Sequence, residues 1–197
     1  MKAAKASISL LFTALWAQGM CLTITLHNAS EFLDIAKNVT KYNGATLVLD
    51  EDLDFSGVQG YVPIGENLRP FYGVFDGQGH TVKSLNISTF YTNAGLLGYT
   101  TGVRVKNIVL DSSCKANYGR TWYNDLTIGS LIGSCVADDD HSTSTVGGIA
   151  GSFSSSTYEA YIKNCVNYGP VTYYYDGYYE VNVGGIVGYL KGSSARV

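Results

Sequence analysis

The densest cluster of side chains able to do chemistry is Asp138-Asp139-Asp140-His141. Carboxylate oxygens are the ligands that hard cations such as Ca²⁺ accept. Adjacent acidic residues in a loop rich in serine and threonine are more commonly just solvated, and the glycine and ligand spacing of a calcium loop are absent. We therefore expect neither a metal site nor a cofactor.

Glycoside hydrolysis also needs carboxylates, one on each side of the scissile bond. Asp138-Asp139, Gly79-His80 and Arg104-Val105-Lys106 are loosely similar to fragments of a polygalacturonase site, but their order is wrong and its Asn-Thr-Asp and Gly-His-Gly elements are missing. The acidic residues between Asp50 and Asp54 are expected to lie on an edge strand and its turn. No Gly-x-Ser-x-Gly, His-Glu-x-x-His or phosphate-loop motif occurs. We expect no catalytic residues, with an extracellular carbohydrate-active enzyme as the alternative.

Tyrosine clusters are better candidates for ligand contact. The segment 171–181 predicts a hairpin that turns at Asp176-Gly177, and a second aromatic loop surrounds Trp122. Exposed aromatic rings stack on sugars or anchor protein interfaces. The alternative is that the rings pack on each other and on the flank of the fold. The candidate ligand-contact residues are Tyr173, Tyr174, Tyr175, Tyr178, Tyr179, Trp122 and Tyr123.

The N-terminus has the pattern of a secretory signal. Lys2 and Lys5 precede an apolar run from Ile8 to Trp16, and Ala17-Gln18-Gly19 places small residues before a cleavage site after Gly19. The run is shorter than the roughly 20 residues that span a bilayer. The sequence predicts a signal peptide over 1–19, no membrane span beyond it, and a secreted or cell-surface protein.

Composition points to an extracellular all-β chain. The formal net charge is −3 and only 15% of residues are charged, which argues against a nucleic-acid partner. The 23 glycines and 16 tyrosines indicate many tight corners between strands. We expect the fold to be all-β, a right-handed parallel β-helix with a short N-terminal capping helix.

A short amphipathic helix is predicted ahead of the strands. Thr23 to Leu26 alternates like an edge strand, Ser30 can cap a helix from about Glu31 to Val39, and Thr46 to Leu49 begins the β structure. A solenoid needs such a cover over its first coil. Residues 20–44 are therefore the expected cap, and 45–197 the expected β-helix.

Four copies of a small–aliphatic–aliphatic–glycine template end at glycines 98, 133, 151 and 188, which are 35, 18 and 37 residues apart. A second template, which begins with an aliphatic residue followed by Lys-Asn, appears in 105–110 and 162–171. Stacked coils of roughly 18 residues align the aliphatic residues into inner rows, and glycine fits where a Cβ would clash. The glycines expected at the corners are Gly95, Gly98, Gly133, Gly148, Gly151, Gly185 and Gly188.

The stretch from Ile162 to Gly188 resembles a full repeat of the GLUG-motif proteins, and Phe71 to Ile87 is similar to the lead-in that often precedes such repeats. The resemblance covers roughly 30–197. It implies a right-handed β-helix on exported or cell-surface proteins, among them bacterial adhesins, non-catalytic regions of immunoglobulin-A peptidases and surface proteins of some protists. It implies no catalytic residues. The sequence departs from the GLUG pattern in two places. Ser130 replaces the first glycine of one repeat, and residues 120–125 lengthen one coil.

Cys114, Cys135 and Cys165 show no metal-ligand spacing and are expected to lie buried in the stack. In a eukaryotic host, the candidate glycosylation sites are Asn28, Asn38 and Asn86. The last repeat ends without a capping segment, so we expect the natural chain to continue. The predicted function is an adhesive or scaffold module that contacts glycans or host proteins, with a passive stalk for another domain as a further alternative.

Overall fold

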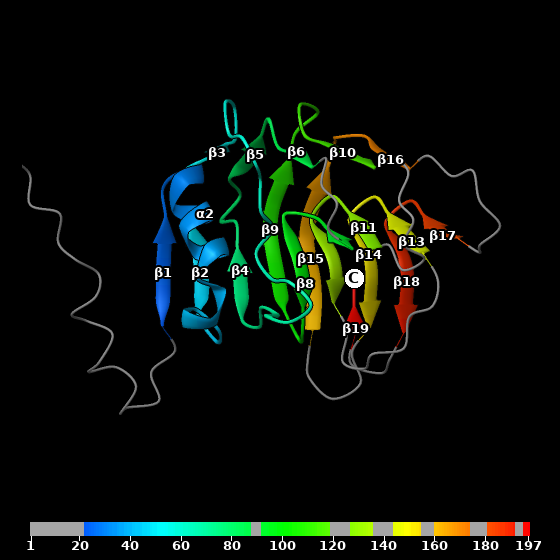
Figure 1. Cartoon of the computed structure of the whole chain (residues 1–197), viewed down its shortest axis with the longest axis horizontal. Helices are drawn as coiled ribbons and strands as arrows, with labels where there is room; N and C mark the ends of the chain where they lie inside the picture. Colours follow the sequence, from blue (N-terminus) through cyan, green and yellow to red (C-terminus); the bar gives the residue numbers. More distant parts are fainter. Residues whose placement is uncertain are drawn as a thin grey trace, which may run out of the picture.

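In the part of the chain that the structure describes, parallel strands form a stack with one short α-helix at one end (Figure 1). The computed structural model describes residues 22–87, 92–118, 127–135, 144–154, 160–173, 181–191 and 195–197. All of the strand pairs within its sheets are parallel. The all-β class predicted from the sequence is confirmed. No helix in the described part of the chain is long and apolar enough to cross a membrane.

The strands of the described residues form four sheets, numbered here by the order in which the chain enters them. Sheet 1 contains β1 (Thr23–Leu26), β2 (Thr46–Leu49), β3 (Leu53–Asp54), β4 (Val74–Asp76), β5 (Thr81–Lys83), β9 (Arg104–Leu110), β15 (Ala160–Asn167) and β19 (Ala195–Arg196). Sheet 2 contains β6 (Asn86–Ile87), β10 (Lys115–Tyr118) and β16 (Val171–Tyr173). Sheet 3 contains β7 (Asn93–Ala94), β11 (Thr127–Gly129), β13 (Ser144–Gly147) and β17 (Val181–Gly184). Sheet 4 contains β8 (Leu97–Thr100), β12 (Ile132–Cys135), β14 (Ala150–Ser154) and β18 (Val187–Lys191).

The chain visits these sheets in the same order on successive passes. Strands β4 to β8 make one pass, β9 to β12 the next, and β15 to β18 the last. Between the last two, the chain adds β13 and β14 on sheets 3 and 4 alone. This extra half-pass produces the 18-residue spacing between two of the repeats.

Register places apolar residues of successive passes on top of one another. One inner row of sheet 1 is Leu47, Phe75, Val105 and Ile162, all of them buried. Sheet 4 has a comparable row beginning Leu97, Ile132 and Ala150. Because each strand alternates its side chains between two faces, one face of every sheet contributes to a continuous core.

A short helix covers the core at the end of the stack where β1 and β2 lie (Figure 1). The helix is α2 (Ala29–Lys37), and a 3₁₀ turn (η2, Val39–Lys41) follows it. Phe32 is fully buried, with its ring 5.5 Å from that of Phe55 and 6.4 Å from that of Phe75.

The helix starts earlier than the sequence pattern predicted. Asn28, not Ser30, is the N-cap: its side-chain oxygen accepts a hydrogen bond from the Glu31 N–H at 3.0 Å. The Glu31 carboxylate in turn accepts from the His27 N–H at 2.9 Å. Asparagine is as good an N-cap residue as serine. The two hydrogen bonds satisfy the backbone N–H groups of Glu31 and His27 together, so a helix that starts after Asn28 is favoured over one that starts after Ser30.

Most of the repeat glycines are required by the closeness of successive passes. Gly95, Gly148 and Gly185 lie in the two-residue connections between sheets 3 and 4, whereas Gly98, Gly133, Gly151 and Gly188 are the second residues of the strands that follow. A Cβ on Gly148 would lie 2.1 Å from the carbonyl oxygen of Gly185 in the next pass. Ser130 occupies the equivalent position one pass earlier, and its hydroxyl donates a hydrogen bond to the Gly148 carbonyl oxygen.

A matched pair of alanine substitutions tests this spacing. Gly148→Ala should lower the free energy of unfolding by about 1–3 kcal/mol, because the added methyl group forces two passes apart. Gly185→Ala should change it by no more than about 0.5 kcal/mol, since nothing lies within 4 Å of the added Cβ. Thermal unfolding of both variants at one low protein concentration measures the difference. Equal destabilisation would contradict the explanation.

Candidate functional site

The aromatic residues predicted to contact ligands fall mostly outside the described residues. Tyr173 is the last residue of β16, and the structure describes its backbone. Tyr174, Tyr175, Tyr178, Tyr179, Trp122 and Tyr123 lie outside the described residues, as does the acidic cluster at 138–141. Within the described ranges, no three His, Cys, Asp or Glu side chains are grouped so as to hold a metal ion.

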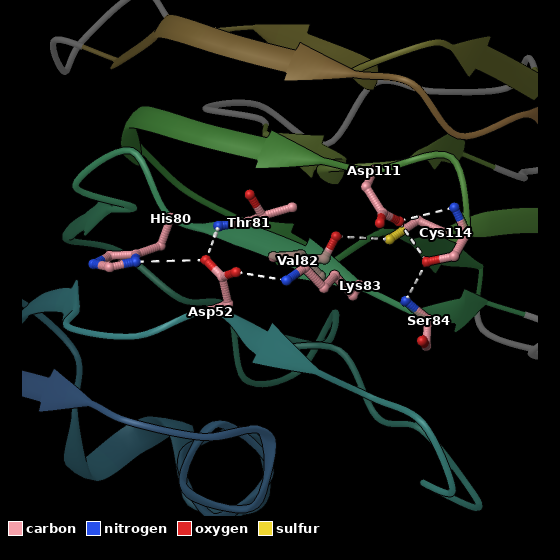
Figure 2. A network of polar contacts seen from close by, with 9 residues as sticks. Asp52, His80, Thr81, Val82, Lys83, Ser84, Asp111 and Cys114 are labelled. Atoms are coloured by element: carbon pink, nitrogen blue, oxygen red, sulfur yellow. Dashed lines mark hydrogen bonds and ion pairs between the residues drawn. The ribbon is translucent and has the colours of Figure 1, made fainter.

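A polar network on β5 contains one histidine–aspartate pair (Figure 2). Asp52 accepts hydrogen bonds from the Thr81 N–H at 2.8 Å and from Lys83 Nζ at 2.6 Å, and His80 Nδ1 lies 3.5 Å from Asp52 Oδ1. The hydrogen bonds from Lys83 and from the Thr81 N–H lower the pKa of Asp52 below its usual value. Asp52 is thus ionised at neutral pH and has no proton to give as a general acid. Its contacts join β5 to the segment before β3.

The same view shows a second group of contacts at the far end of β5 (Figure 2). The Ser84 N–H donates to Ser113 Oγ at 2.7 Å, and the Ser113 hydroxyl donates to Asp111. The Cys114 thiol donates to the Val82 carbonyl oxygen at 3.2 Å. Burial raises the pKa of Cys114, which keeps it a thiol rather than the thiolate that a nucleophile requires.

Asp76 is the buried carboxylate of the described residues, with 4% of its surface exposed. It accepts hydrogen bonds from Gln78 Nε2 at 2.6 Å and Asn107 Nδ2 at 3.1 Å, and Lys106 Nζ lies 2.8 Å away. Asn164 of the next pass donates to Asn107 Oδ1 at 3.2 Å, so the polar ladder spans three passes. Burial raises the pKa of Asp76, but the hydrogen bonds from Lys106, the Gln78 N–H and Asn107 outweigh it, and the pKa is lowered. This carboxylate is structural.

The residues with positive φ in the turn beside Asp76 are Gln78 (52°) and Gly79 (90°). The φ angle of Gly77 is not positive. The His80 N–H donates to the Gly77 carbonyl oxygen at 2.8 Å, which closes the turn. Gly77 is needed instead because a Cβ there would lie 2.4 Å from the Asn107 carbonyl oxygen.

Glu66 and Arg69 form an antiparallel bridge that closes a hairpin with a two-residue loop. The Arg69 N–H donates to the Glu66 carbonyl oxygen at 2.8 Å, and the Glu66 N–H donates back to the Arg69 carbonyl oxygen at 3.1 Å. The Glu66 carboxylate and the Arg69 guanidinium form an ion pair at 2.9 Å. Asn93, at the start of β7, donates a side-chain hydrogen bond to Asn67 in the hairpin loop. These contacts fix the hairpin against the stack.

Leu68 occupies the tip of this hairpin, and its residue surface is 94% exposed. A pocket of about 190 Å³ lies beside it, lined by Gly65, Glu66, Asn67, Leu68, Thr92 and Asn93. The site therefore combines one apolar side chain with carboxylate, amide and hydroxyl groups. Sequence reasoning missed it; the only signal was the opposite charges of Glu66 and Arg69 on either side of Asn67-Leu68.

The remaining predicted residues occupy defined places. Cys114 is buried, Cys165 is partly buried, and neither forms a disulfide. Asn28 and Asn86 are exposed, and Asn38 Nδ2 donates to the Asp34 carbonyl oxygen at 3.0 Å at the end of α2. Glycosylation of these asparagines stays a prediction.

Asp76→Asn should destabilise the protein by about 1–3 kcal/mol at neutral pH, because it leaves Lys106 without its anion. The pKa of Asp76 is lowered, so its contribution is fully present above the ordinary value near 3.8 and disappears as the pH falls through the lower folded value. The difference between wild type and variant in the free energy of urea unfolding should thus shrink below about pH 4.

Asp52→Asn is the control. It is expected to lower the free energy of unfolding by less than about 1 kcal/mol, because the Asp52 side chain is 42% exposed. If the stability difference between wild type and Asp76→Asn did not change with pH, the proposed role of the Asp76 carboxylate would be wrong.

Comparisons with known proteins support the fold. No protein-family model matches the sequence, and a search of curated proteins finds no match. Among solved structures, a Bacteroides ovatus protein that carries the provisional name immunoglobulin A1 protease is similar, with a TM-score of 0.50 and 18% sequence identity. The match covers 90% of this chain and 55% of the other chain. The chain thus spans about half the length of a larger bacterial protein with the same β-rich fold.

Proposed function

We propose that this protein is a secreted or cell-surface adhesive module built on a right-handed β-helix of the kind found in GLUG-motif proteins. Two observations support the β-helix: the chain returns to the same four parallel sheets in a constant order, and its repeats stack in register. Connections between parallel strands of one sheet are right-handed in about 98% of cases. The apolar run at 8–16 supports export.

The observation that carries the adhesive role is Leu68 on its fixed hairpin. A large apolar side chain that is 94% exposed contributes nothing to the core. Two backbone hydrogen bonds and the ion pair between Glu66 and Arg69 already order the loop, so a partner loses little entropy in binding it. Burying one leucine side chain contributes about 1.5–3 kcal/mol. We infer that the hairpin inserts Leu68 into an apolar pocket of a host or cell-surface protein.

The aromatic loops are the second proposed contact. Tyr173, in β16, leads into the tyrosine-rich segment, and Trp122 and Tyr123 lie between β10 and β11. Rings of this kind stack on the apolar faces of sugars. In this proposal they supply the glycan contact and the hairpin supplies the protein contact.

A second candidate is an extracellular enzyme, or the passive stalk of one. The provisional name of the Bacteroides ovatus protein favours it. Incubation with immunoglobulin A1 and with polysaccharides, followed by gel electrophoresis and a reducing-end assay, tests for catalysis. Fragments or reducing ends above those of a buffer control would favour the enzyme.

The adhesive proposal is tested by binding to a panel of extracellular host proteins and to a glycan array. Leu68→Ser should weaken binding to the protein partner by about 10- to 100-fold, as expected for one buried leucine. Val166→Ser, at an aliphatic side chain exposed elsewhere on the stack, is the matched control and should leave binding unchanged. Glycan binding should instead be lost when Tyr174, Tyr178 and Tyr179 are replaced by serine. If the protein bound neither the host proteins nor the glycans, the adhesive role would be wrong, and the passive stalk would remain as the alternative.

A further inference from the structure

Two neighbouring strands in the middle of sheet 1 carry only positive charge. Strands β9 and β15 lie side by side there (Figure 1). They contain Arg104, Lys106 and Lys163, and neither strand contains an aspartate or a glutamate. The whole chain has a formal net charge of −3, and its exposed carboxylates at 50–54 follow β2, in an earlier part of the stack. Positive charge is therefore concentrated on these two strands against the overall balance of the chain.

The basic side chains share the solvent-facing side of the sheet with a tyrosine. Val105 and Ile162 are in register and buried, so the residues on either side of them point outward. Two register pairs result, Arg104 with Tyr161 and Lys106 with Lys163. Paired strands lie about 4.8 Å apart, and alternate residues of one strand lie about 6.6 Å apart. We call the four outward residues the basic face: Arg104, Lys106, Tyr161 and Lys163.

One of the two lysines is neutralised within the fold, and the other is not. Lys106 Nζ lies 2.8 Å from Asp76 Oδ2 of the preceding pass. None of the ion pairs among the described residues includes Lys163 or Arg104. Like charges that lie directly opposite each other in a sheet are destabilising, so the pairing of Lys106 with Lys163 weakens the fold. Proteins break such stability rules chiefly at functional sites, and a bound anion would compensate the excess charge.

The chemistry of the basic face fits a carboxylate that is carried on a sugar. The Arg104 guanidinium can donate two parallel hydrogen bonds to a carboxylate, and the Lys163 ammonium supplies a further positive charge beside it. The Tyr161 side chain is partly exposed and offers an apolar ring face on which a sugar can stack. A negative charge next to a stackable ring is the combination that an acidic sugar presents.

The basic face carries too little charge for other polyanions. Proteins that bind duplex DNA commonly make about 6–10 phosphate contacts, and anionic membranes are recognised by clusters of about 4–8 Lys and Arg residues. In the described part of the chain, Arg104 and Lys163 are the cations of the basic face that have no ion-pair partner. A polysaccharide with carboxylates spaced along its length needs no more, because its hydroxyl groups and ring faces supply the other contacts.

We propose that the basic face binds a polysaccharide whose sugars carry carboxylate groups. Arg104 and Lys163 hold the carboxylate, Tyr161 stacks on the sugar ring, and Lys106 stays paired with Asp76. The site is separate from the Leu68 hairpin and from the tyrosine-rich segment at 171–181. It adds an acidic glycan to the proposed adhesive role, and it requires neither of the other two contacts.

Binding of the purified protein to a hyaluronan oligosaccharide, in which every second sugar carries a carboxylate, tests the proposal. Isothermal titration calorimetry in about 0.15 M salt should detect binding, and dextran, a neutral polysaccharide, should give none. Arg104→Gln and Lys163→Gln should each raise the dissociation constant at least about fivefold, because each removes a charge-assisted contact. Lys163→Gln should not lower the melting temperature, since it also removes the repulsion with Lys106.

Two variants of Tyr161 separate stacking from charge. Tyr161→Phe keeps the ring, so its dissociation constant should stay within about twofold of that of the wild type. Tyr161→Ser removes the ring and should weaken binding by about three- to tenfold.

Lys37→Gln is the matched control. It removes one exposed positive charge from α2, at the other end of the sheet, and should leave hyaluronan binding unchanged.

Three results would overturn the proposal. The first is a wild type that does not bind hyaluronan, and the second is unchanged binding in both Arg104→Gln and Lys163→Gln. The third is tighter binding to dextran sulfate or to phosphatidylserine vesicles than to hyaluronan, which would assign the basic face to a sulfate or a lipid anion. If the host-protein panel or the glycan array still showed binding, the adhesive role would stand without this site.

Discussion

The spacing between successive passes is the constraint on which the rest of the structure depends. Paired strands lie about 4.8 Å apart, which leaves room for one layer of side chains inside the stack and for none where the backbones of successive passes come closest. Gly77, Gly148 and Gly188 are small for this reason: a Cβ on any of them would come within 2.7 Å of a carbonyl oxygen in a neighbouring pass. The same spacing lets each apolar residue be covered by the residue in register above it, so the core grows one layer at a time.

Polar side chains use this spacing as well. Asp76, Asn107 and Asn164 connect three passes through hydrogen bonds, and the two asparagines have φ angles of 56° and 53°. Asparagine adopts this left-handed conformation more readily than most residues. A one-residue slip in register would separate the ladder and turn the apolar rows outward, so polar and apolar contacts specify the same alignment.

The periodic parts of this fold could be predicted from the sequence, because they depend on local patterns. The repeat templates marked the connections between sheets 3 and 4, and the apolar face of α2 was visible in Phe32, Ile35 and Ala36. The N-cap was wrong because Asn28 and Ser30 both suit that role, and only the Glu31 contact decides between them. The hairpin at Leu68 was missed because its hydrogen bond to the stack is made by Asn93, which is distant in sequence. Long-range contacts of this kind leave no periodic signal.

The half-pass of β13 and β14 affects the shape of the molecule. Between β6 and β16, sheet 2 advances by two strand spacings, whereas sheet 3 advances by three between β7 and β17. Over these passes, sheet 3 therefore extends about 4.8 Å further than sheet 2. A difference of this kind is expected to tilt successive layers toward the side with fewer strands. An insertion of about 18 residues thus acts as a wedge, and the number of such wedges in a chain of this type would set its curvature.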